Sequence, residues 1–206
     1  CSSEKTALYK QSVAGDGASM IDLTSGFGID FYFISLHFKK AEYVERNADL
    51  CRIASHNFKS LGATNVSATN ADGIELIKAS TSHYDLIFLD PARRDKNGKK
   101  TVEIKDCEPD VAALKETLLS KCDRMMLKLS PMLDIKSAIR DLSCVEEVHV
   151  VAVDNECKEL LFVCKKGASF KRIVAANIKP DGKTEMLEST SASPTGCSSY
   201  SAPLTY

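Results

Sequence analysis

The sequence lacks the features that would indicate a membrane, secreted or zinc-binding protein. No apolar run reaches the roughly 18 residues that a transmembrane helix needs, and no charged-then-apolar leader is present, so we expect neither a membrane span nor export. The eight cysteines form no CxxC pair and no His/Cys cluster with the spacing of a zinc site. Several lie in apolar runs, as Cys164 does, which is typical of buried free thiols in a reducing compartment. We therefore expect a cytoplasmic protein without a metal site.

A charge bias is also missing. The 27 basic and 28 acidic residues leave a net charge of -1, so RNA binding would depend on a local patch rather than on an overall field. The 206 residues, 44% of them hydrophobic, exclude disorder for most of the chain and fit one packed domain with or without part of a second. Because the chain starts at Cys1 and ends in an apolar stretch, we expect a piece of a longer protein.

Short apolar segments alternate with helical patterns through residue 142, and two further apolar segments follow. Strands are predicted over 20–23, 41–45, 65–69, 84–89, 123–129, 145–153 and 158–165. This order predicts an α/β fold with a doubly wound, Rossmann-like, seven-stranded sheet. The sheet is expected to be mostly parallel, with the last strand pair forming an antiparallel edge. Residues 168–180 have the pattern of one more strand, and residues 188–206 are rich in Ser, Thr, Ala and Pro.

Four acidic residues stand at or just after the ends of four successive predicted strands. They are Asp22, Glu45, Asp72 and Asp90. In an open α/β sheet, ligands bind at the carboxyl ends of the strands, where the winding reverses. We therefore expect these carboxylates to converge on one crevice.

The first strand leads into a glycine turn, Asp22-Leu-Thr-Ser-Gly26-Phe-Gly28. Glycines let the backbone pass close to a ligand, but the third glycine of a dinucleotide fingerprint is missing. Asp22 suits a positively charged group, such as an α-ammonium, and Glu45 can accept both hydroxyls of a ribose. Asp72 can accept an adenine amine or cap the next helix, and both roles are compatible.

The fourth strand runs into Asp90-Pro-Ala-Arg-Arg94. Pro91 fixes the backbone where the chain leaves the sheet, which places Asp90 over the ligand. A basic cluster follows, and it is either a phosphate-binding patch or an ordinary solvated loop. Its members are Arg93, Arg94, Lys96, Lys99, Lys100 and Lys105.

Together these motifs resemble those of class I S-adenosylmethionine-dependent methyltransferases. The resemblance covers residues from about 2 to 165. The strings Asp-Leu-Thr-Ser-Gly-Phe-Gly-Ile-Asp, Leu-Asp-Pro-Ala-Arg-Arg-Asp, Lys-Leu-Ser-Pro-Met-Leu-Asp and Asn-Glu-Cys-Lys-Glu-Leu-Leu are similar to bacterial methyltransferases that carry a THUMP-like domain. The resemblance implies a methyltransferase domain over 1–167 and, over 168–206, a linker or the start of a THUMP-like module. It also implies an RNA-modifying enzyme of class EC 2.1.1.

The resemblance assigns roles to individual residues. Asp22, Thr24, Gly26 and Gly28 would line the methionine part of the cofactor, Glu45 its ribose and Asp72 its adenine. Asp90 and Pro91 would be catalytic, with Asp90 also near the cofactor. Ser3, Arg93 and Arg94 would contact the substrate, Ser3 because the entry segment Ser2-Ser3-Glu4 resembles that of guanine-N2 RNA methyltransferases, with Ser3 in place of proline.

Two departures from the family motifs limit which methyl acceptors are expected. The aromatic residue that usually ends the fourth motif of amino-group methyltransferases is replaced by Arg93, so the resemblance does not predict base stacking there. No cysteine follows the fifth strand, where the sequence is Leu129-Ser130-Pro131, so covalent uracil chemistry is not expected. The sequence predicts methyl transfer to a base nitrogen of RNA. Two alternatives remain: a nucleotide-binding oxidoreductase, and a methyltransferase-like module that binds RNA or a partner without catalysis.

Overall fold

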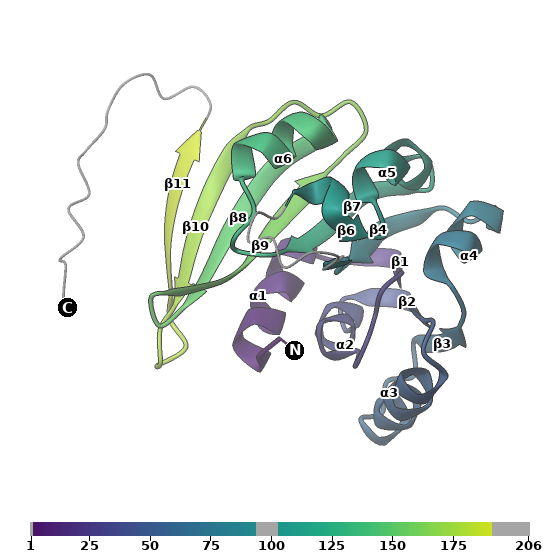
Figure 1. Ribbon diagram of the computed structural model, residues 1–206. Helices are drawn as coiled ribbons and strands as arrows, with labels where there is room; N and C mark the ends of the chain where they lie inside the picture. Colours follow the sequence, from purple (N-terminus) through teal and green to yellow (C-terminus); the bar gives the residue numbers. More distant parts are fainter. Residues whose placement is uncertain (1, 94–102, 191–206) are drawn as a thin grey trace.

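The computed structural model describes residues 2–93 and 103–190 (Figure 1). In chain order the elements are α1 (Glu4–Ala14), β1 (Gly17–Asp22), α2 (Ile29–Ser35), β2 (Phe38–Glu45), α3 (Ala48–Ser60), β3 (Val66–Asn70), α4 (Gly73–Ala79), β4 (Tyr84–Leu89), β5 (Ala92–Arg93), η1 (Ile104–Asp106), β6 (Cys107–Glu108), α5 (Val111–Leu119), β7 (Cys122–Leu129), α6 (Ile135–Leu142), β8 (Val145–Val153), β9 (Glu156–Cys164), β10 (Arg172–Ile178) and β11 (Thr184–Thr190). No helix within the described ranges is long and apolar enough to cross a membrane.

Nine strands form the main sheet, in the order β11-β10-β8-β9-β7-β4-β1-β2-β3. Within this sheet the neighbouring strands β3, β2, β1, β4 and β7 are parallel to one another, and β9 lies antiparallel between β7 and β8. The winding reverses between β1 and β4, because the chain leaves β1 for β2 on one side and later returns to β4 on the other. The carboxyl ends of these two strands are therefore where a ligand is expected.

The predicted strand count of seven is wrong. The further strand predicted over 168–180 is confirmed as β10, which is parallel to β8, and β11, antiparallel to β10, was not predicted. For the same reason the pair β8–β9 is not the edge of the sheet as predicted, since β10 covers β8. The prediction of a THUMP-like module within 168–206 remains untested, and residues 191–206 lie outside the described part of the chain.

Helices cover both faces of the sheet (Figure 1). On one face, α1, α2 and α3 bury apolar side chains such as Phe31 and Phe58. On the other, α4, α5 and α6 do the same with Ile77, Leu118 and Leu142. This two-sided burial explains why the end of β1 and most of β4, the two central strands, are short apolar runs.

Side-chain caps fix where most helices begin. A serine, asparagine or aspartate accepts a hydrogen bond from a backbone N–H of the first turn in α1, α3, α4, α5 and α6. The capping residues are Ser3, Asn47, Asp72, Asp110 and Asp134. Asp110 and Asp134 thus set the starts of α5 at Val111 and of α6 at Ile135.

Candidate active site

The glycine turn links three strands through backbone and side-chain hydrogen bonds. The Ser25 N–H donates to the Val44 carbonyl at 3.2 Å, and the Asp90 N–H donates to Thr24 Oγ1 at 2.7 Å. Gly28 has a φ of 74°, and a Cβ there would lie 2.6 Å from Phe58 Cζ, so the tight packing of this turn requires glycine. A Cβ on Gly26 would meet nothing within 4 Å, which leaves the space beside this residue open.

Asp22 is buried at the end of β1, with 1% of its surface exposed. Its Oδ1 accepts the Thr24 N–H at 2.9 Å. Burial raises the pKa of Asp22 well above the usual value, and the charges of Asp30 and Asp90 raise it further against the opposing hydrogen bond from Thr24. A cationic ligand group beside Asp22 would favour its ionised form.

A cavity of about 190 Å³ lies over the glycine turn, and we call it the methionine-side cavity. Its lining includes every residue that the sequence assigned to the methionine part of a cofactor. The lining residues are Ser2, Asp22, Thr24, Ser25, Gly26, Phe27, Gly28, Ile29, Asp30, Phe88, Asp90 and Lys128.

A larger cavity of about 520 Å³ lies at the ends of β2 and β3 and is lined by both Glu45 and Asp72. The two carboxyl oxygens of Glu45 accept the N–H groups of Gly26 at 2.8 Å and Asn47 at 2.7 Å. Asp72 Oδ1 accepts the N–H groups of Ile74 and Glu75 at 2.9 and 3.0 Å. Each carboxylate has about four acceptor positions in all, so capacity for ligand hydroxyl or amine groups remains.

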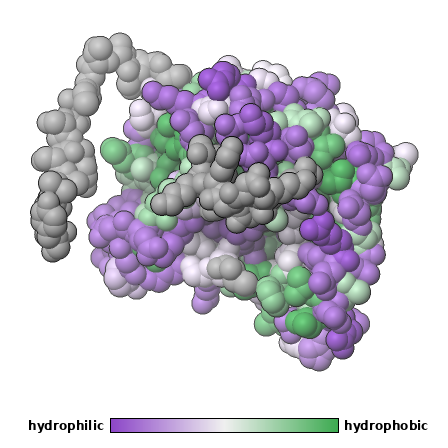
Figure 2. Space-filling view, viewed as in Figure 1, coloured by the Kyte–Doolittle hydropathy of each residue, from purple (hydrophilic) through white to green (hydrophobic). Residues whose placement is uncertain are grey.

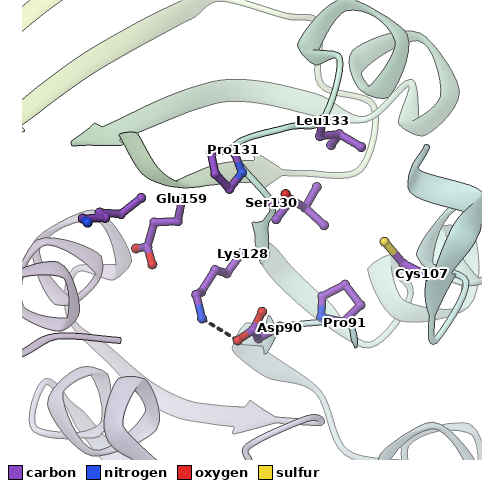
Figure 3. A pocket seen from close by; sticks show the side chains of 10 residues that line it. Asp90, Pro91, Cys107, Lys128, Ser130, Pro131, Leu133 and Glu159 are labelled. Carbon is purple, nitrogen blue, oxygen red and sulfur yellow. Dashed lines mark hydrogen bonds and ion pairs between the residues drawn. The ribbon is translucent and has the colours of Figure 1, made fainter. Parts of the chain in front are cut away.

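Asp90 lies where three cavities meet. Besides the two cavities above, it lines a third of about 240 Å³ (Figure 3). That third cavity also contains Pro91, Cys107, Lys128, Leu129, Ser130, Pro131, Leu133, Lys158 and Glu159. A group bound there would lie beside the other two cavities at Asp90. We call this third cavity the acceptor cavity.

An ion-pair network that the sequence analysis missed borders the acceptor cavity. Lys128 Nζ lies 2.5 Å from Asp90 Oδ2 and 3.6 Å from Asp30 Oδ2. Fully buried Lys10 pairs with Asp30 at 3.1 Å and also with Glu159. One signal was available, because Lys128 and Glu159 are charged residues at the ends of apolar strand sequences. The pairing of Glu159 with Lys10, which lies 149 residues earlier in the chain, carries no local signature.

The substrate roles of Ser3, Arg93 and Arg94 stay predictions, and the structure describes the first two of these residues. Ser3 caps α1, accepting the Thr6 N–H at 3.3 Å, and it is Ser2 that lines the methionine-side cavity. Arg93 belongs to β5, where it pairs with Cys107 of β6. Arg94 lies outside the described residues, as do Lys96, Lys99 and Lys100 of the predicted basic cluster. Lys105 is described, and its ammonium pairs with Glu103 at 2.5 Å.

The chain matches no family model, but it is similar to individual proteins. It is 32% identical to a provisionally named methyltransferase of Porphyromonas gingivalis W83, over 92% of this chain and 48% of that one, with a TM-score of 0.79. It is 33% identical over 76 residues to an uncharacterised RNA methyltransferase of Mycoplasma mobile, a match that covers 37% of this chain and 21% of that protein. The chain thus spans about half of the first and about a fifth of the second.

A more distant structure shares the fold. TrmK of M. capricolum, solved with S-adenosyl-homocysteine, superposes with a TM-score of 0.59 at 11% identity, over 80% of this chain and 69% of that one. The chain therefore has the class I methyltransferase fold, an α/β fold with a mostly parallel sheet, extended here to nine strands.

Proposed function

We propose that the chain is an S-adenosylmethionine-dependent methyltransferase that acts on RNA in the cytoplasm. One observation carries the proposal: Asp90 lines three cavities at once. Two of them fit the two ends of a sulfonium nucleoside, and the third, which has a separate lining, is open to the methyl acceptor. The names of the similar proteins support methyl transfer and, in one case, RNA as the substrate. A THUMP-like module following this domain would supply further affinity for RNA.

The residues present fit the cofactor. The open space beside Gly26 admits a ligand against the backbone, and Thr24 lines both the 190 Å³ and the 520 Å³ cavities, so one extended molecule can occupy both. Glu45 and Asp72 would bind the ribose and adenine, while Asp22 would lie near the amino-acid end. When bound, S-adenosylmethionine supplies a methyl group that its sulfonium has already activated.

The chain itself mainly positions the two reactants. Bringing donor and acceptor together in line removes much of the entropy cost of a bimolecular step. Asp90 would accept a hydrogen bond from the acceptor group and hold it toward the methyl. A base nitrogen, as predicted from the sequence, is one such acceptor, and a target base in a duplex would first have to leave the stack.

Calorimetry with S-adenosylhomocysteine and with NAD tests the cofactor. Binding of S-adenosylhomocysteine alone is expected, whereas preference for NAD would favour the oxidoreductase. Nucleoside mass spectrometry of RNA from cells with and without the gene then tests the substrate. We expect one methylated nucleoside to be missing without the gene. Cofactor binding with no such difference, and no turnover on any extracted RNA pool, would favour the non-catalytic binding module.

A further inference from the structure

The acceptor cavity holds a lysine ammonium where the methyl acceptor would bind. Lys128 lines both this cavity and the methionine-side cavity, and 18% of its side chain is exposed. Burial lowers its pKa, but the nearby carboxylates of Asp90 and Asp30 outweigh this effect, so the pKa of Lys128 lies above its usual value. Lys128 is therefore a cation with three N–H donors at the place where the acceptor atom must approach the methyl.

This cation and the adjacent Asp90 make a matched pair for a hydroxyl group. A hydroxyl has one O–H to donate and two lone pairs to offer. It can donate to Asp90, accept from Lys128 and still direct one lone pair at a methyl group. The exocyclic amine of a base has no comparable spare lone pair, so an ammonium facing it would lack a partner or compete with the methyl for the same electrons.

The lining of the acceptor cavity argues in the same direction. None of its described residues is aromatic, whereas recognition of an unstacked base usually relies on stacking against an aromatic or guanidinium plane. Phe27 is 54% exposed, but it lines the methionine-side cavity rather than the acceptor cavity. A ribose needs no stacking partner, and its 2′-hydroxyl is the group that distinguishes RNA from DNA.

We propose that the methyl acceptor is a ribose 2′-hydroxyl of RNA, held between Lys128 and Asp90. This inference rests on the proposed function and replaces the base nitrogen with a different acceptor atom. In the reaction, the ribose oxygen forms a bond to the methyl carbon as the carbon–sulfur bond breaks, and the sulfur keeps the electron pair. The hydroxyl proton passes to the Asp90 carboxylate, so the positive charge of the sulfonium and the negative charge of Asp90 are neutralised together, and release of the proton to solvent then restores the carboxylate.

The buried part of the network supports this arrangement by positioning Lys128. Asp30 lies between the ammonium groups of Lys10 and Lys128, and Lys10 is tied in turn to Glu159. Lys128 therefore has carboxylates on two sides, which holds its ammonium at the boundary of the acceptor cavity. Lys10 itself is fully buried and acts through Asp30 rather than on the acceptor.

The position of the transferred methyl group tests the proposal directly. The chain is incubated with S-adenosylmethionine carrying a labelled methyl and with RNA from cells that lack the gene, and the RNA is then hydrolysed in alkali. Alkaline cleavage needs a free 2′-hydroxyl, so a ribose label is expected in alkali-stable dinucleotides. Label in mononucleotides would place the methyl on a base and overturn this inference while leaving the proposed function intact. No label in any RNA would remove the proposed function and this inference with it.

Substitutions at Lys128 test the role of the cation. Lys128→Met is expected to lower the methyl-transfer rate by about 10²-fold or more, in the range seen when a charge-stabilising donor is removed from an active site. Lys128→Arg should recover part of the rate, and Lys40→Met, an exposed lysine of β2, is the matched control. Retained binding of S-adenosylhomocysteine by each variant shows that it is folded. Unchanged turnover by a folded Lys128→Met would overturn the assignment.

Discussion

The two sides of the candidate site hold their carboxylates by different means. On the cofactor side, Asp22, Glu45 and Asp72 each accept a backbone N–H from the residue two positions later. On the acceptor side, Asp90 and Glu159 are paired with lysine ammoniums from distant elements, and Asp30, which lines the methionine-side cavity, pairs with both of these lysines. Each carboxylate of the first kind has a hydrogen bond within its own turn, whereas those of the second kind depend on the packing of the whole domain.

The largest expected effect is on the acceptor side, at the junction of the cavities. Asp90→Ala removes the group that would take the acceptor proton, so turnover should fall by about 10²- to 10⁴-fold. Because its contact to the glycine turn is through its backbone N–H, affinity for S-adenosylhomocysteine should be largely preserved. Methyl-transfer assays and calorimetry measure the two quantities.

Asp123→Ala is the control and should leave both quantities unchanged, because Asp123 lies at the N-terminal end of β7, away from the cavities, with 68% of its side chain exposed. Loss of cofactor binding in Asp90→Ala would assign Asp90 to the cofactor side and erase the contrast between the two sides. Full activity would remove Asp90 from the site.

Breaking the buried network should cost the most stability. Lys10→Met leaves the carboxylates of Asp30 and Glu159 without their buried cation, and removal of one partner of a buried ion pair typically costs about 3–5 kcal/mol. Urea unfolding of the variant and the wild type measures the difference in the free energy of unfolding. Lys5→Met, at a partly exposed lysine of the same helix, is the control. Equal stability of Lys10→Met and wild type would contradict the importance of long-range pairing.

A smaller effect is expected from a carboxylate held by the backbone. Glu45→Gln keeps one oxygen for a backbone N–H but loses the charge and the second acceptor oxygen. The affinity for S-adenosylhomocysteine should fall about tenfold, equivalent to ~1.4 kcal/mol. Calorimetry measures the affinity, and Glu42→Gln, a carboxylate of the same strand that bonds Tyr84 instead, is the control. No change in affinity would mean that Glu45 serves the turn alone.

The smallest expected effect is a pH dependence at Asp22. Because burial raises the pKa of Asp22 in the folded chain, folding favours its protonated form. Its contribution to stability is therefore fully present below the ordinary value of 3.8 and is lost as pH rises through the higher folded-state pKa. Asp22→Asn keeps an acceptor for Thr24 but cannot titrate.

The free energy of unfolding of the wild type, relative to that of Asp22→Asn, should thus fall as pH rises above about 3.8, the ordinary pKa of the group. Urea titrations of both proteins at several pH values measure this difference. A difference that is constant with pH would show that the folded chain leaves the titration of Asp22 unchanged.

The same contrast explains what could be predicted from the sequence. The strands that end at Asp22, Glu45 and Asp90 were predicted because they are apolar runs followed by turn residues, and the cofactor-side carboxylates lie in those turns. Lys10 was missed because nothing near it in the sequence indicates that it pairs with Asp30 and Glu159. The further strand predicted over 168–180 is present as β10, whereas β11 was missed because it is exposed throughout and has no buried face to give a pattern of alternation.

Asp90 also lines all three cavities, which has a consequence for how the site can diversify. The Asp90 N–H donates to the Thr24 hydroxyl and so links the acceptor cavity to the glycine turn, whereas the acceptor cavity takes most of its lining from residues 129–133 and from the start of β9. Exchanges in those two short segments can reshape what receives the methyl group while the nucleoside-binding turn stays intact. A change of methyl acceptor during evolution therefore requires substitutions in only a few residues, and related domains can differ in acceptor specificity while the residues that bind the methyl donor stay the same.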